Sequence, residues 1–174
     1  MKKFSTKRVV TDGLLTAIAL VIYVVELQIP IPFPVPGVKL GLSNIITLFA
    51  LFFTGPVDAI IILLVRIFIG SLFSGNITAV FFSLSGGLLC YFVTIILKRF
   101  VTDKQIWVLG VFGAIAHNVG QIALAVFYTG TKEIALYLPV LILAGVITGL
   151  FTGLAAQYLI NGLKGHLKIE DKDK

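Results

Sequence analysis

Long apolar stretches alternate with short breaks along the whole chain. Each stretch holds enough consecutive apolar residues to cross about 30 Å of hydrocarbon as a helix. The breaks contain proline, glycine or runs of polar residues, which interrupt helices. The pattern therefore predicts six membrane-spanning helices, over about 11–29, 38–54, 56–74, 76–97, 106–128 and 134–161.

The first break is unusual, because four of the six prolines stand at alternate positions in it, from Pro30 to Pro36. Proline fixes φ, removes a backbone donor and disfavours helix at the preceding residue. We therefore expect an extended segment that leads through Gly37 and Lys39 into the helix 38–54. That helix is the shortest of the six, so it is expected to start below the membrane surface. The apolar side chains between the prolines are interpreted as a lid over a binding site: Ile31, Phe33 and Val35.

The composition agrees with this pattern. Of the 174 residues, 58% are apolar and only 13% are charged, whereas soluble domains carry about 25% charged residues. A soluble globular fold is thereby excluded. We expect an all-α integral membrane protein with a single transmembrane domain, residues 1–174, embedded in the lipid bilayer. The single cysteine, Cys90, excludes an internal disulfide and a cysteine metal cluster.

The net charge of +6 is interpreted as a sign of membrane topology, and no nucleic-acid partner is expected. With six spans both termini lie on one side, and residues 162–174 form a charged tail there. The positive-inside rule favours a cytoplasmic position for both termini of a multi-pass protein of the cell membrane. The other side would keep only Lys39 and Lys132. The cytoplasmic side would hold eleven of the fourteen basic residues: Lys2, Lys3, Lys7, Arg8, Lys98, Arg99, Lys104, Lys164, Lys168, Lys172 and Lys174.

Arg66 stands near the middle of the predicted span 56–74. A guanidinium keeps its proton, and a charge at that depth must be paired or hydrated. Arg66 is therefore a candidate for binding a carboxylate or phosphate of a substrate with two parallel hydrogen bonds. The alternative is a structural role, either as an ion pair with Glu26 or as a cap on helix carbonyls.

The span 106–128 carries three neighbouring polar residues, His117, Asn118 and Gln121. Residues 117 and 121 are one turn apart on the same helix face, and 118 lies beside them. Polar side chains in the middle of a span are expected to face the bundle interior. They are interpreted as a hydrogen-bonding wall of a ligand site, with hydrogen bonds between helices as the alternative.

The outer ends of the first two spans add further candidates. Glu26 ends the first span, and Lys39 and Asn44 begin the second. Lys39 and the first N–H groups of that helix are expected to form a positive pocket mouth, although Lys39 could instead extend to the membrane surface. Asp12 and Asp58 are interpreted as helix caps.

Small residues predict close helix packing in two places. Gly145, Gly149 and Gly153 repeat every four residues in the last span, which is typical of a helix pressed against a neighbour. Gly13 and Ala17 are also four residues apart, in the first span. Their face could pack inside the bundle or against another membrane protein.

The motif inventory favours recognition over catalysis. The chain has no G-x-x-x-x-G-K-[ST] loop for ATP and no aspartate-rich pair for magnesium diphosphate. No nucleophile and base stand out together, so we expect no enzyme activity, no cofactor and no catalytic residue. A metal site is not expected either, because His117 has no evident partner ligands.

Six short spans with basic inner ends and a long first outer loop resemble the S components of energy-coupling factor (ECF) transporters. The segment Pro34-Val-Pro-Gly-Val-Lys-Leu-Gly-Leu-Ser-Asn-Ile-Ile-Thr-Leu48 resembles the signature of one branch. That branch is the Gx transporter family, also labelled heptaprenyl diphosphate synthase component I-like. The resemblance covers nearly the whole chain.

The resemblance implies a membrane subunit that captures a small vitamin-like, cofactor-like or quinone-precursor ligand from outside. It further implies a loop that closes over the ligand, a transmembrane T component that docks on small residues of the first span, and two cytoplasmic ATPases. The docking face would contain Gly13 and Ala17, followed by Val21 where the family often has a third small residue. Two alternatives are an accessory subunit of a prenyl diphosphate synthase or redox complex, and a self-sufficient transporter.

Overall fold

The computed structural model describes residues 6–29, 39–75 and 77–170, and all regular elements in these ranges are helices. Five of them are long and apolar enough to cross a membrane, and a shorter one lies among them. The predicted class, an all-α multi-pass membrane protein, is confirmed. The elements are α1 (Thr6–Glu26), α2 (Asn44–Phe53), α3 (Pro56–Ser74), α4 (Thr78–Leu97), α5 (Ile106–Thr129), the 3₁₀ helix η1 (Lys132–Tyr137) and α6 (Leu138–Glu170).

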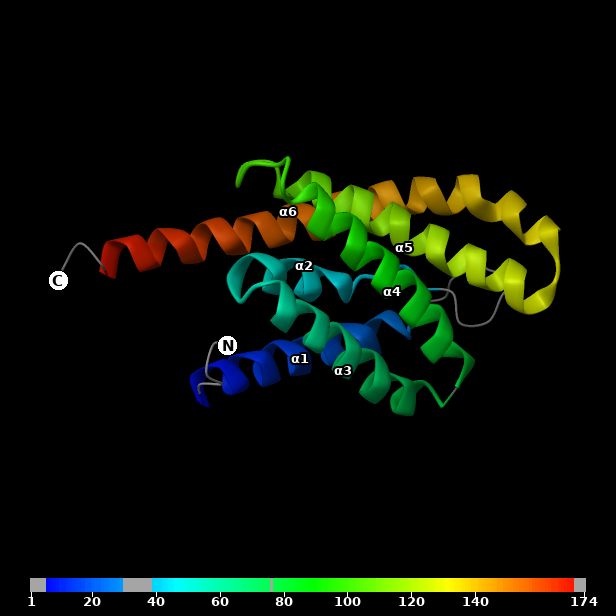
Figure 1. Ribbon diagram of the computed structural model, residues 1–174, viewed down its shortest axis with the longest axis horizontal. Coiled ribbons are helices and arrows are strands. Elements are labelled where there is room, and N and C mark those ends of the chain that lie inside the picture. The colour runs from blue at the N-terminus through cyan, green and yellow to red at the C-terminus, as the bar shows by residue number, and fades with distance from the viewer. Residues whose placement is uncertain (1–5, 30–38, 76, 171–174) are drawn as a thin grey trace.

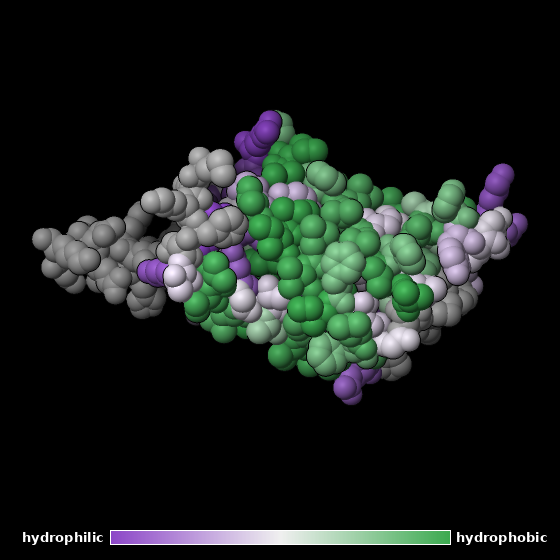
Figure 2. Space-filling model, turned by 60° about the horizontal axis from the view of Figure 1, so that its bottom comes forward, coloured by the Kyte–Doolittle hydropathy of each residue, from purple (hydrophilic) through white to green (hydrophobic). Residues whose placement is uncertain are grey.

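The outer surface of the bundle is apolar. Figure 2 shows hydrophobic side chains over most of the visible face, with most hydrophilic ones at its margins. Large apolar side chains such as Phe68, Leu72 and Phe151 are more than half exposed. An apolar surface of this extent marks contact with a membrane.

The helices form a bundle in which α2 lies at the centre (Figure 1). The short α2 packs against α3 on one side and α6 on another, while α5 packs against both α4 and α6. The start of α1, the α2–α3 turn and the α4–α5 loop lie at one end of the bundle, which we call the basic end because Lys7, Arg8, Lys98, Arg99 and Lys104 lie there. The core between the helices contains Leu51, Ile62, Leu63, Ile106 and Leu109.

The second helix differs from its prediction, because it begins at Asn44 instead of near residue 38. Residues 39–43 form no helix, since Gly41 has a φ of +78° that a helix cannot contain. At ten residues, α2 rises about 15 Å, so it cannot cross a bilayer alone. The polar residues at its start are consequently held inside the bundle.

The remaining boundaries agree less evenly. The first helix, α1, runs from Thr6 to Glu26, where 11–29 was predicted. The third, fourth and fifth predicted spans agree with α3, α4 and α5 to within two residues. The last span is preceded by η1, and its helix continues through the predicted tail to Glu170.

The glycines of α6 bring it very close to α5. A Cβ on Gly149 would lie 2.7 Å from the carbonyl oxygen of Gly110, and one on Gly153 would lie 2.6 Å from that of Trp107. These distances are too short for any side chain, so the close packing predicted from the glycine spacing is confirmed.

Candidate functional site

Buried polar side chains from α1, α2, α3 and α5 meet near the segment 39–43. They lie between helices whose core is mostly apolar, and several are almost fully enclosed. We call this group the polar cluster. Its members are Tyr23, Glu26, Lys39, Ser43, Asn44, Arg66, His117 and Gln121.

Glu26, at the end of α1, holds the segment 39–43 against the bundle. Its carboxylate accepts hydrogen bonds from the backbone N–H groups of Gly41 and Ser43, the latter at 3.4 Å. Glu26 is only 2% exposed, so its charge depends on these donors. The left-handed Gly41 turns its N–H toward α1, which explains why the chain is not helical here.

Lys39 joins the segment to two further helices. Its backbone N–H donates to Gln121 Oε1 at 3.1 Å. Its ammonium donates to the Tyr23 hydroxyl and lies 3.9 Å from the centre of the Tyr23 ring. Lys39 therefore points into the bundle and does not extend to the membrane surface.

Arg66 projects from α3 and is only 3% exposed. Its guanidinium donates to the Ser43 hydroxyl and, at 3.0 Å, to Asn44 Oδ1. Its Nε has no acceptor within the described part of the chain. The ion pair with Glu26 that was the structural alternative is not formed, because the Glu26 carboxylate binds backbone N–H groups instead. Among the described residues, Arg66 is thus held by uncharged partners only.

His117 lies between two side-chain amides. Its Nδ1 lies 3.1 Å from Asn44 Nδ2, and its Nε2 lies 2.9 Å from Gln121 Nε2. The orientation of each amide is fixed by its oxygen, which accepts from Arg66 or from the backbone of Lys39. A neutral imidazole can accept at one nitrogen only. One of the two amide N–H groups therefore lacks a good acceptor in this arrangement.

The polar cluster consequently offers more donors than acceptors. In the described part of the chain Arg66 Nε has no acceptor, the two amide groups compete for the single acceptor nitrogen of His117, and two cations, Lys39 and Arg66, face a single carboxylate, Glu26. An unsatisfied buried donor costs about 1–3 kcal/mol, and more when it is charged. A ligand that supplies negatively charged or carbonyl oxygens would remove this imbalance.

The free space beside these groups is small. A cavity lined by members of the cluster and by Ser83 has a volume of about 10 Å³. This is room for roughly one water molecule. A second cavity of about 20 Å³ lies beyond Asn44 and Gly41, toward Leu48, Cys90 and Leu109. A vitamin-sized ligand needs several hundred Å³, so the segment 39–43 would have to move outward to admit one.

The structure brings together most of the predicted binding residues: Glu26, Lys39, Asn44, Arg66, His117 and Gln121. Asn118 is placed differently, because its amide donates to the carbonyl of Leu141 on α6 at 2.7 Å. Asn118 therefore links α5 to α6, although its Oδ1 has no donor in the described part. The predicted lid residues Ile31, Phe33 and Val35 lie outside the described residues.

Three members of the site were missed in the sequence. Ser43 and Ser83 gave no signal, because both were predicted to lie in helices, where a serine usually bonds to its own backbone. Tyr23 did give a signal, since it precedes Glu26 by three residues and so lies on the same face of α1.

Asp58 was interpreted as a cap, yet it forms an ion pair with Arg8.

The docking residues predicted on α1 lie on an open surface. Gly13 and Ala17 are both exposed, and no atom lies within 4 Å of the position of a Cβ on Gly13. This face contrasts with the glycine face of α6. No group of three or more His, Cys, Asp or Glu side chains that could hold a metal gathers among the described residues.

A family model described as "Heptaprenyl diphosphate synthase component I" matches residues 15–159. The match covers most of the chain and includes every member of the polar cluster. The chain therefore belongs to this family, as the segment Pro34–Leu48 predicted. Comparisons with curated proteins and with solved structures gave no match.

Proposed function

We propose that the protein is the substrate-binding subunit of an ECF-type uptake transporter and that it captures a small acidic ligand from outside. The observation that carries the proposal is Arg66, a buried cation whose hydrogen-bond partners among the described residues are all uncharged and whose Nε has no acceptor among them. Uncompensated buried charges in membrane proteins commonly mark substrate sites.

The ligand proposed is vitamin-like, cofactor-like or a quinone precursor, with a carboxylate, phosphate or acidic phenol. Such an anion would accept from the guanidinium of Arg66, and its remaining oxygens would accept from Lys39 or the amide of Gln121. The proposal includes no chemical reaction, because every role given to these side chains is one of binding.

Partner binding is proposed for the open face of α1. Gly13 and Ala17 would let a T component approach closely, and two cytoplasmic ATPases would supply the energy. Both termini would then lie in the cytoplasm, since Lys7, Arg8, Lys98, Arg99 and Lys104 all lie at the basic end of the bundle.

An affinity tag on the protein tests the assembly. Purification from native membranes should recover a membrane subunit and a pair of ATPases. The family description names a synthase component, so recovery of a prenyl diphosphate synthase without ATPases would favour the accessory-subunit alternative instead.

Substitutions on α1 test the docking face. Gly13→Leu and Ala17→Leu should leave ligand affinity unchanged but abolish uptake, because a bulky side chain separates the two membrane proteins. Gly162→Leu is the matched control, since this glycine of α6 also has no atom within 4 Å of its Cβ position. Normal uptake by both α1 variants would exclude this face as the docking surface.

A further inference from the structure

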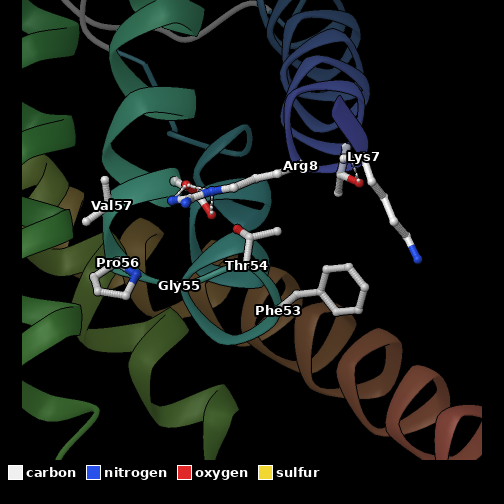
Figure 3. Close-up of a pocket in the computed structure, with 9 residues that line it drawn as sticks. Lys7, Arg8, Phe53, Thr54, Gly55, Pro56 and Val57 are labelled. Carbon is white, nitrogen blue, oxygen red and sulfur yellow. Dashed lines mark hydrogen bonds and ion pairs between the residues drawn. The ribbon is translucent and has the colours of Figure 1, made fainter. Parts of the chain in front are cut away.

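A further cavity lies far from the polar cluster, at the basic end of the bundle. It measures about 500 Å³ and lies between the start of α1 and the turn that joins α2 to α3 (Figure 3). It is lined by Lys7, Arg8, Thr11, Phe53, Thr54, Gly55, Pro56, Val57 and Asp58.

An ion pair forms the inner wall of this cavity. Arg8 Nε donates to both carboxylate oxygens of Asp58, at 2.8 and 3.0 Å, and the Arg8 Nη2 donates to one of them. Asp58 is 2% exposed, so it relies on Arg8 for its charge. The pair therefore holds α1 against α3. Asp12, one turn further along α1, interacts electrostatically with both members of the pair but does not line the cavity.

The other walls have two kinds of surface. Phe53, Pro56 and Val57 present apolar side chains, and Phe53 and Val57 are about half exposed. Lys7 contributes a positive charge with no counterpart in the lining, because Asp58 already faces Arg8. Figure 3 shows the Lys7 side chain extending away from the ion pair.

The position of the cavity fits the boundary between lipid headgroups and acyl chains. It lies where membrane-spanning helices end, and Lys98, Arg99 and Lys104 belong to the same end of the bundle. Basic pockets between helix ends attract anionic lipid headgroups, with about 1 kcal/mol for each Lys or Arg near the surface. A neutral or cationic occupant would gain nothing from Lys7.

We propose that this cavity binds an anionic phospholipid, with the phosphate at Lys7 and the glycerol and first acyl carbons against Phe53, Pro56 and Val57. The volume suits such a fragment, because small-molecule sites typically measure 300–1,000 Å³. The lipid would fill the space between α1 and the α2–α3 turn and so support the ion pair from the outside. This proposal does not depend on the proposed transport function.

Native mass spectrometry of the purified protein, titrated with dioleoyl phosphatidylglycerol or dioleoyl phosphatidylcholine in mixed micelles, tests the proposal. The anionic lipid should bind at least about fivefold more tightly than the zwitterionic one. Lys7→Gln should weaken phosphatidylglycerol binding about fivefold, as loss of one surface charge predicts. Lys104→Gln, which removes the same charge outside the cavity, should leave it unchanged.

A second variant tests the apolar walls. Thr11→Phe should fill the cavity and reduce lipid binding, and an unchanged unfolding temperature would show that the variant is folded. Equal binding of both lipids, or equal effects of Lys7→Gln and Lys104→Gln, would overturn the proposal. Displacement of phosphatidylglycerol by millimolar inorganic phosphate would also overturn it, because the acyl part would then contribute nothing.

Discussion

The two inward-pointing arginines of this bundle are held in opposite ways. Arg8 forms a two-oxygen ion pair with Asp58 and is still partly open to its surroundings. Arg66 is almost fully enclosed, yet its described partners are the neutral oxygens of Ser43 and Asn44.

The different partners of the two arginines suggest different roles, one in structure and one in ligand binding. In a buried ion pair the two charges neutralise each other, whereas a cation with neutral partners retains strong attraction for an anion. The surplus of donors around His117 extends the same argument to the neighbouring side chains. We therefore propose that Arg66 belongs to the ligand site and that Arg8 has a structural role.

The largest effect on ligand affinity is expected for Arg66→Gln. Loss of a buried, charged hydrogen-bonding partner costs about 2–5 kcal/mol, so affinity should fall about 30-fold or more. Isothermal titration with the ligand recovered from the wild-type protein measures this change. The unfolding temperature of the same sample serves as the folding control, and an unchanged affinity would make Arg66 a structural residue.

Lys39→Gln should weaken the ligand less, by about tenfold. The substitution removes the ammonium that contacts Tyr23, but it keeps the backbone N–H that donates to Gln121. A charged hydrogen bond contributes about 1.5–3 kcal/mol, which sets the scale of the loss. Lys132→Gln is the matched control, because Lys132 begins η1 and lies outside the polar cluster. Equal affinities of the two variants would remove Lys39 from the site.

Glu26→Gln should loosen the segment 39–43 without unfolding the bundle. The neutral amide accepts the N–H groups of Gly41 and Ser43 more weakly than the carboxylate does, by about 1 kcal/mol. Hydrogen exchange at these two amides should accelerate about fivefold. Glu133→Gln, at an exposed position of η1, should not change it. Unaltered exchange in Glu26→Gln would show that the segment is held by other contacts.

The smallest effect on affinity is expected for Arg8→Gln, at less than about twofold, because distant sites act independently. This variant should instead lower the unfolding temperature, since the buried Asp58 loses its cation. Adding Asp58→Asn should restore part of the stability. A large loss of ligand binding in Arg8→Gln would contradict the division between the two arginines.

The sequence predicted the membrane class and most helix boundaries, because the length of an apolar run determines whether it can span a bilayer. It failed at the start of α2, where the predicted helix 38–54 included Gly41 but the observed helix begins at Asn44. Gly41 has a positive φ, and its N–H donates to Glu26, fifteen positions earlier in the chain, a contact that no local pattern contains.

The sequence identified several residues of the candidate site, but it did not identify their contacts. Polar residues in apolar spans had to face the interior, so Arg66, His117 and Gln121 could be identified. Their partners could not, because Asn118 turns to α6 while Ser43 and Tyr23 turn inward. The same holds for the small residues, since Gly149 is covered by α5 and Gly13 is open.

We propose that Arg66 binds an anionic ligand. The charge of the natural ligand tests this proposal most directly. Wild-type protein and the Arg66→Gln variant should be purified in parallel, denatured to release bound small molecules, and analysed by mass spectrometry in both ion modes. We predict that wild-type protein releases an acidic compound and that the variant releases little or none of it. An uncharged or cationic compound, recovered equally from both proteins, would contradict the account.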